Sequence, residues 1–183
     1  MSDLRQPIPV KLFVGMISNE PPLFNECTEI LSAEFGALDL RAPIMAWDQT
    51  EYYRHEMGTG LQRTFVFFER LLEDPAQLAS IKTMTNLIEN RFTQTGSKNR
   101  RINIDPGYIT EAKVVLASTK DFSHRIYIGR SIYAEVTLQF REQGRTFVAL
   151  GHTYPDFRRH DMIELFNGAR GLLRAKLKKL RSG

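Results

Sequence analysis

Residues 118–125, with the sequence STKDFSHR, gather side chains that could do chemistry. They supply cationic donors, hydroxyl groups and one carboxylate: Lys120, His124, Arg125, Ser118, Thr119, Ser123 and Asp121. This mixture suits the binding of phosphate or carboxylate oxygens. Asp121 could orient His124 or accept a substrate proton, and His124 could act as a general acid or base. The alternative interpretation is an ordinary hydrophilic loop between two strands.

A second candidate is Asp105, in the stretch RRINIDPGY (100–108). Asp-Pro-Gly at 105–107 has proline and glycine in the order of a type II turn, so we predict a turn there. A carboxylate on a stiff turn near Arg100 and Arg101 could be a base or a metal ligand, and Arg101 could contact a ligand. Alternatively, Asp105 only bonds its own backbone, as is common in turns.

A third polar segment is GHTYPDFRRHD (151–161). His152, Asp156 and His160 recur at four-residue intervals, which would place three metal ligands on one face of an uninterrupted helix. Pro155 interrupts the pattern, so we predict a helix that begins after it, with Asp156 as its N-cap or first-turn acid, and we assign no metal site. The segment supplies three predicted ligand contacts: Tyr154, Asp156 and Arg158.

Motifs of several enzyme classes are absent. The chain has no G-x-x-x-x-G-K-[ST] loop, G-x-S-x-G elbow, H-E-x-x-H helix or G-x-G-x-x-G turn, so no cofactor is indicated. Cys27 is the only cysteine, which excludes an intramolecular disulfide and a zinc site built from several thiolates. Its place on the apolar side of a predicted helix favours a buried, inert thiol.

The positive charge of the chain is concentrated at its C-terminal end. The net charge is +4 over 183 residues, but residues 158–183 hold eight Lys and Arg against two acids. Arg170, Arg174 and Lys178 recur at four-residue spacing on a predicted helix and could contact RNA or an acidic protein. The alternative is a solvated basic face near a helix C-terminus. No apolar run is long enough for a membrane span, so we expect a soluble, cytoplasmic protein.

Hydrophobic periodicity predicts the order of the elements. Apolar runs and alternation predict strands at 10–18, 37–47, 61–71, 111–118, 125–140 and 145–154. Apolar residues at helical spacing predict helices at 23–36, 74–92 and from residue 161 onward.

Strand, helix, strand, strand, helix, strand is the order of a split βαβ, or ferredoxin-like, unit. We therefore predict an α+β fold with a mixed or antiparallel sheet, extended by a C-terminal β-hairpin and helix. The length fits a single domain over residues 1–183, with a flexible arm at 1–9 and a flexible tail at 181–183.

Four stretches of the sequence also resemble a known family. KLFVGMIS, NIDPGYIT, LASTKDFSHRIYIGRSIYAEVTL and HTYPDFR are similar to the bacterial family catalogued as domain of unknown function 4416. The resemblance covers nearly the whole chain. It implies a small, single-domain bacterial protein and carries no activity, ligand or catalytic residue with it.

The leading hypothesis places one pocket between the Asp105 turn, the loop 118–125 and the segment 153–159. It would bind an anionic, phosphorylated ligand. In an enzyme, Asp105 or Asp121 would be the base or a metal ligand, and the stabilising charges would come from three cations: Lys120, Arg125 and Arg158. The alternatives are a nucleic-acid module that stacks bases on Phe65, Phe67, Tyr127 and Tyr133, and a partner-binding domain without chemistry.

Overall fold

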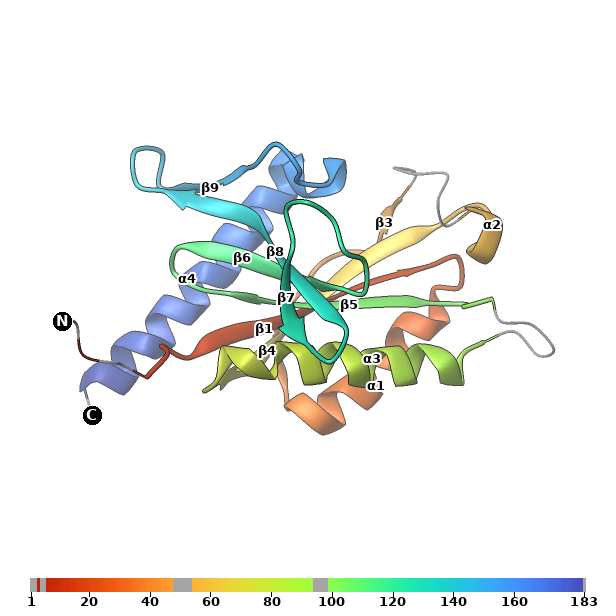
Figure 1. Cartoon of the computed structure of the whole chain (residues 1–183), viewed down its shortest axis with the longest axis horizontal. Helices are drawn as coiled ribbons and strands as arrows, with labels where there is room; N and C mark the ends of the chain where they lie inside the picture. The colour runs from red at the N-terminus through yellow and green to blue at the C-terminus, as the bar shows by residue number, and fades with distance from the viewer. Residues whose placement is uncertain (1–2, 4–5, 48–53, 94–98, 183) are drawn as a thin grey trace.

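This computed structural model describes residues 3, 6–47, 54–93 and 99–182. Within these residues, nine strands form one sheet in which neighbouring strands are antiparallel (Figure 1). Seven strands follow the spatial order β2-β4-β1-β5-β6-β8-β7, while β3 pairs with β4 and β9 with β8. The strands are β1 Val10–Ser18, β2 Leu38–Arg41, β3 Met45–Ala46, β4 Gln62–Leu72, β5 Asn103–Ile109, β6 Lys113–Ser118, β7 Ile126–Gly129, β8 Ile132–Arg141 and β9 Thr146–Ala149.

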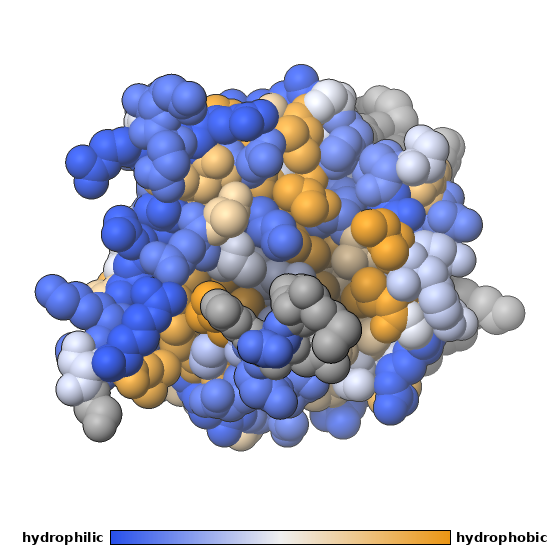
Figure 2. All heavy atoms as spheres, turned by 60° about the vertical axis from the view of Figure 1, so that its left-hand side comes forward, coloured by the Kyte–Doolittle hydropathy of each residue, from blue (hydrophilic) through white to orange (hydrophobic). Residues whose placement is uncertain are grey.

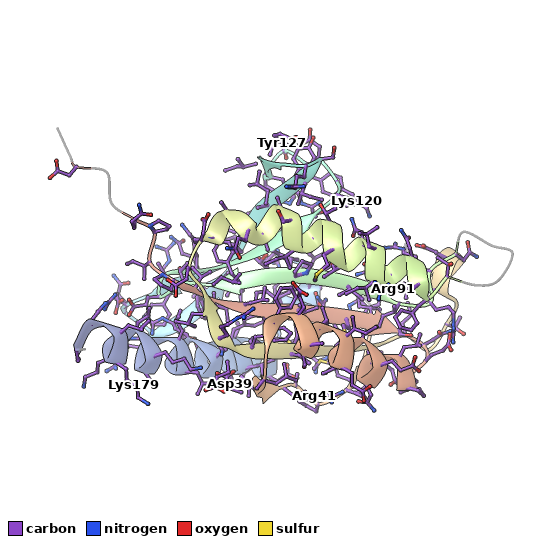
Figure 3. All side chains as sticks on the ribbon, turned by 90° about the horizontal axis from the view of Figure 1, so that it is seen from below. Asp39, Arg41, Arg91, Lys120, Tyr127 and Lys179 are labelled. Carbon is purple, nitrogen blue, oxygen red and sulfur yellow. The ribbon has the colours of Figure 1, made fainter. Side chains whose placement is uncertain are left out.

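Helices cover both faces of the sheet. α1 (Pro22–Phe35) and α3 (Leu78–Arg91) lie beside each other on one face (Figure 1, Figure 3). α4 (His160–Ser182) packs on the other face. Three short helices complete the described chain: α2 Arg54–Met57, the 3-10 helix η2 Pro75–Gln77 and the 3-10 helix η3 Pro155–Arg158.

β1 is the centre of this three-layer arrangement, because every one of its residues is buried. Its alternate side chains enter two separate cores, since successive residues of a strand point to opposite faces. Val14 packs in the core under α1 and α3, whereas Phe13 lies in the core under α4. Phe65 and Phe67 are fully buried in that second core. The interpretation of these two rings as base-stacking faces is therefore wrong.

Most of the predicted elements are confirmed. The helices predicted at 23–36, at 74–92 and from residue 161 are α1, α3 and α4, with ends that differ by a few residues. The α+β class and the antiparallel sheet are confirmed as well. No helix of the described residues is long and apolar enough to cross a membrane.

Two predicted strands are each divided into two shorter strands. The strand predicted at 125–140 is the hairpin β7–β8, whose turn residues Arg130 and Ser131 have φ of 55° and 58°. Such left-handed pairs are usual in two-residue hairpins, but they are normally marked by glycine or asparagine. The strand predicted at 37–47 is divided into β2 and β3 around Pro43, which has no N–H for a ladder.

The turn predicted at Asp105-Pro106-Gly107 is also wrong, because these residues lie inside β5. Asp105 pairs with Gly15 of β1 and Pro106 with Val14. The ladder between β5 and β6 begins only at Gly107↔Leu116, so residues 103–106 have a strand neighbour on one side alone. A proline is tolerated at such an edge position. The stretch marks the place where β5 and β6 separate.

Candidate functional site

A cavity of about 430 Å³ lies where β5 and β6 separate. Its wall is built by residues of β1, β4, α3, β5 and β6, by the loop that follows β6 and by residues 154–156. The opening between the two strands gives side chains from the far face of the sheet a route into the cavity. Five cations from separate parts of the chain line it: Arg63, Lys82, Arg100, Lys120 and Arg125.

Arg63 and Asp156 form a buried ion pair on the β4 side of the cavity. Their side chains are 6% and 8% exposed. The guanidinium of Arg63 lies 4.5 Å from the ring centre of Phe65 and 4.9 Å from that of Phe157. Because an isolated charge is costly in such a place, each residue needs the other. The pair also fixes η3 against β4.

Lys82 reaches the cavity from α3, on the opposite side of the sheet. Its Nζ donates to Asp105 Oδ1 at 2.8 Å and to the carbonyl of Ile104 at 2.8 Å. Glu89 Oε1 lies 3.6 Å from the same ammonium. The other oxygen of Asp105 accepts from Asn103 Nδ2 at 2.6 Å. The carboxylate is thus held on both oxygens.

This environment keeps Asp105 ionised. Burial by itself raises the pKa of the carboxyl, but the charge of Lys82 and the hydrogen bonds from Lys82 and Asn103 outweigh it, so the pKa lies below its ordinary value. A carboxylate with a low pKa is a weak proton acceptor at neutral pH. The arrangement therefore favours a positioning and electrostatic role for Asp105 over the role of a general base.

Arg100 links α2 to the same wall. Its Nε and Nη2 donate to the two oxygens of Glu56 at 2.7 and 2.8 Å, and its Nη1 donates to Glu89 and to Asn103, both at 2.9 Å. The hydrogen bonds that the guanidinium donates to Glu56 are the main reason that its pKa is raised. Forked pairs of this kind are geometrically rigid.

Arg125 organises the mouth of the cavity. Its Nε donates to Glu135 at 2.8 Å, and its Nη1 donates to Ser118 Oγ at 2.7 Å and to the carbonyl of Lys120 at 2.9 Å. Its Nη2 donates to the hydroxyl of Tyr154 at 3.0 Å. The side chain is only 2% exposed. Arg125 therefore joins the loop after β6 to the segment that precedes α4.

His124 lies behind this mouth. Its Nε2 is 3.1 Å from Glu135 Oε2, the same oxygen that accepts from Arg125. Its ring stacks on that of His152, with 4.3 Å between the centres and 14° between the planes. His152 Nε2 in turn lies 2.9 Å from the carbonyl of Val136. The two histidines brace the loop against β8 and do not line the cavity.

The wall has more positive than negative charge. Five cations and two carboxylates, Asp105 and Asp156, line it, an excess of three positive charges. Three further carboxylates, Glu56, Glu89 and Glu135, pair with lining cations but are not part of the lining. A ligand in the cavity would thus contact the cations and not these three acids.

The structure brings the three polar segments together at one place. Seven of the predicted site residues line the cavity: Asp105, Ser118, Thr119, Lys120, Arg125, Tyr154 and Asp156. In Figure 3, Lys120 stands on the edge of the molecule that also carries Tyr127. Asp156 is in the first turn of η3 and does not cap α4, because its carboxylate pairs with Arg63.

Five predicted site residues do not line the cavity: Arg101, Asp121, Ser123, His124 and Arg158. Asp121 and Ser123 are exposed on the loop. Arg101 pairs with Glu20, with 2.8 Å between Nε and Oε1. Arg158 donates to backbone carbonyls of the turn before η3, including that of Thr153 at 2.7 Å, and so has a local structural role.

Two cations that line the cavity, Arg63 and Lys82, were not among the predicted site residues, although there was a reason in the sequence to consider them. Arg63 shares the period-two face of β4 with Phe65, which is a buried face. Lys82 lies on the apolar side of α3, among Leu78, Ile81 and other buried residues. A cation on a buried face needs a partner, and its position marks a polar site inside the fold.

The basic face of α4 has intramolecular contacts. Arg170 Nε donates to the carbonyl of Glu111 at 2.6 Å, and its guanidinium lies 3.4 Å from the ring centre of Phe140. Arg174 pairs with the Glu111 carboxylate at 3.2 Å, and Lys178 lines a second groove beside these residues. Figure 2, which brings the end with both termini forward, shows mainly hydrophilic side chains there. RNA or an acidic protein as a partner of Arg170, Arg174 and Lys178 stays a prediction.

Among the residues that the structure describes, no group of three or more His, Cys, Asp and Glu side chains is arranged to hold a metal ion. His152, Asp156 and His160 in particular are separated. His152 turns to β8, and Asp156 turns to β4.

Comparison with protein-family models gives a match over most of the chain. The family model described as "Domain of unknown function (DUF4416)" matches residues 8–172. No curated protein and no solved structure matches the chain.

Proposed function

The chain belongs to the DUF4416 family, whose description names no activity, so we propose from the geometry of the cavity that the protein binds a small anionic molecule there. The observation that carries this proposal is the convergence of five cations on one cavity with only two lining carboxylates. A volume of about 430 Å³ lies in the range of roughly 300–1,000 Å³ that is usual for small-molecule sites.

The cations differ in how they would act. Arg63 and Lys82 are held in buried ion pairs and would form a rigid floor. Lys120 and Arg125 belong to the loop at the mouth, where Ser118 and Thr119 add hydroxyl groups. A phosphate or carboxylate group at this mouth would have ammonium and hydroxyl donors within one short loop, which is the donor set that such anions prefer.

Backbone groups support the same assignment. Residues 103–106 of β5 and 117–118 of β6 do not pair with each other. The backbone N–H and C=O groups on these two facing strand edges therefore do not bond to each other at the cavity. Polar ligand atoms could bond to such edges as a strand neighbour would. The combination of cations, hydroxyls and open strand edges favours a compact, highly polar anion.

The cavity also lies at the boundary between two parts of the sheet. We infer that β1, α1, β2, β4, α3 and β5 form a split βαβ unit of the ferredoxin-like kind. The strand order β2-β4-β1-β5 and the two helices on one face support this inference. β6, β8, β7 and β9 then extend the sheet beyond β5, and the site lies where this extension begins.

The test is a thermal-shift screen of the whole protein. The probes are inorganic phosphate, sugar phosphates, nucleoside monophosphates and dicarboxylates, and each organic anion is tested beside its neutral counterpart. A ligand that binds only the folded state stabilises it by about 2.7 kcal/mol at a hundredfold excess over its Kd. We expect anions to raise the midpoint and their neutral counterparts to leave it unchanged.

A matched pair of variants locates the binding. Lys120→Gln removes a lining cation, whereas Lys113→Gln removes an exposed cation at the opposite end of the β6 region. We expect only Lys120→Gln to weaken the shift. Equal shifts with neutral compounds, or equal losses in the two variants, would contradict the proposal.

A further inference from the structure

Two aromatic rings stand at the mouth of the cavity. Phe122 is 48% exposed and Tyr154 is 36% exposed, and both line the cavity. Large apolar side chains that remain in contact with water beside a cavity are typical of surfaces that bind something. The buried indole of Trp47 and the buried cations Arg63 and Lys82 also line the cavity.

Arg125 supports both rings from behind. Its guanidinium lies 4.6 Å from the ring centre of Phe122 and donates to the Tyr154 hydroxyl at 3.0 Å. Glu135 holds the same guanidinium, and both of these charged side chains are almost fully buried. The rings are therefore fixed before any ligand arrives, which lowers the entropy that binding costs.

We propose that the ligand of this cavity carries a planar aromatic ring beside its anionic group, as a nucleoside monophosphate does. This inference rests on the proposed function. The ring lies against Phe122 and Tyr154 at the mouth, because aromatic side chains stack on bases of any sequence. The anionic group lies against the cations of the wall, among them Lys120 and Arg63.

The dimensions favour a single nucleotide over a nucleic-acid strand. The cavity is one site of about 430 Å³, and five cations line it. A groove that follows a strand would instead carry its cations in a row, with aromatic side chains spaced between them. A free mononucleotide is thus the ligand class to which the geometry points.

The protein contains its own probe for this binding. Trp47 is the single tryptophan of the chain, is 7% exposed and lines the cavity. A ring or phosphate that enters the cavity changes the surroundings of this indole and hence its fluorescence. The titration needs no label, and thermal shift provides an independent second readout.

The experiment titrates the whole protein with the four common nucleoside monophosphates, with ribose 5-phosphate and with the four nucleosides. We expect at least one nucleoside monophosphate to bind about fivefold or more tightly than ribose 5-phosphate, since one stacked base contributes that factor or more. We expect its nucleoside to bind more weakly as well, because it lacks the anion.

Variants test whether Phe122 and Tyr154 cause the preference for a nucleoside monophosphate over ribose 5-phosphate. Phe122→Leu and Tyr154→Leu keep an apolar side chain but remove a stacking face, and each should lose most of the preference over ribose 5-phosphate. Tyr154→Phe keeps the ring. Tyr127→Leu is the matched control, because Tyr127 is 59% exposed but does not line the cavity. Both controls should retain the preference.

The possible failures are distinguishable. If ribose 5-phosphate binds as tightly as every nucleotide, or Phe122→Leu and Tyr154→Leu leave the preference intact, the ring inference is wrong and the anion site stands. If nucleosides bind as tightly as nucleotides, or no anion binds, the proposed function itself is wrong. A short single-stranded oligonucleotide that binds far more tightly than any mononucleotide would overturn the single-nucleotide assignment.

Discussion

Lys82 of α3 bonds to Asp105 of β5 through the opening between β5 and β6, with 2.8 Å between Nζ and Oδ1. Lys82 comes from the helix layer on one face of the sheet, whereas Asp105 belongs to a strand of the sheet. The contact exists because the β5–β6 ladder stops before Asp105, so that a side chain from the α3 layer can cross to the cavity side. Both residues of this ion pair line the cavity, so the pair stabilises that part of its wall.

Replacing Lys82 by methionine should therefore destabilise the protein. The substitution leaves the carboxylates of Asp105 and Glu89 without the cation that they share. Removal of one partner of a buried ion pair lowers the free energy of unfolding by about 3 kcal/mol or more. Urea denaturation followed by circular dichroism measures the change. The double variant Lys82→Met/Asp105→Asn should be less unstable than the sum of the single changes, since it removes the unpaired charge. Strict additivity would show that the pair does not interact.

Asp105 should also make stability depend on pH in the acid range. Its folded-state pKa lies below the ordinary value of 3.8, so its stabilisation is complete above that value and is lost as pH falls through the folded-state pKa. Asp105→Asn lacks this contribution. The difference in unfolding free energy between the native protein and the variant should be largest above about pH 4 and should shrink below it. Two parallel curves from neutral to strongly acid pH would refute this.

Gly107 should not tolerate a side chain. A Cβ at this position would lie 2.4 Å from Phe13 Cζ and 2.4 Å from the carbonyl oxygen of Val115. Overpacking of this kind costs about 1–3 kcal/mol, so Gly107→Ala should lower the midpoint of thermal unfolding. Gly151→Ala is the control, because no atom lies within 4 Å of its added Cβ. Equal midpoints for the two variants would contradict the close approach of β5 to its neighbours.

Cys27 should react with alkylating reagents only when the protein unfolds. The thiol is fully buried, and burial is the main reason that its pKa is raised to about 12. The thiolate is the reactive form, so it is almost absent at neutral pH. Labelling by iodoacetamide, followed by mass spectrometry across a urea series, should track global unfolding. Rapid labelling of the native protein would reveal local opening of α1.

Local patterns of the sequence predicted the elements well. Leu23, Phe24, Cys27 and Leu31 recur at helical spacing and belong to α1, because the side that a helical residue faces depends only on its position along the helix. Turns were predicted less well. Arg130 and Ser131, both with positive φ, form the turn between the paired strands β7 and β8, and Pro106 lies in β5, which pairs with the distant β1. Strand pairing decided the conformation in both places.

By itself, the sequence determined the α+β class, the three long helices and the three polar segments that supply seven lining residues of the cavity. The tertiary structure alone decided which side chains meet there. Arg63 comes from strand β4 of the sheet and Lys82 from helix α3 on one face of it, whereas Asp121, in the same loop as Lys120, is exposed to solvent. The reason is physical: periodicity reports whether a residue faces the core, whereas contact between distant residues depends on strand order and on where a ladder ends.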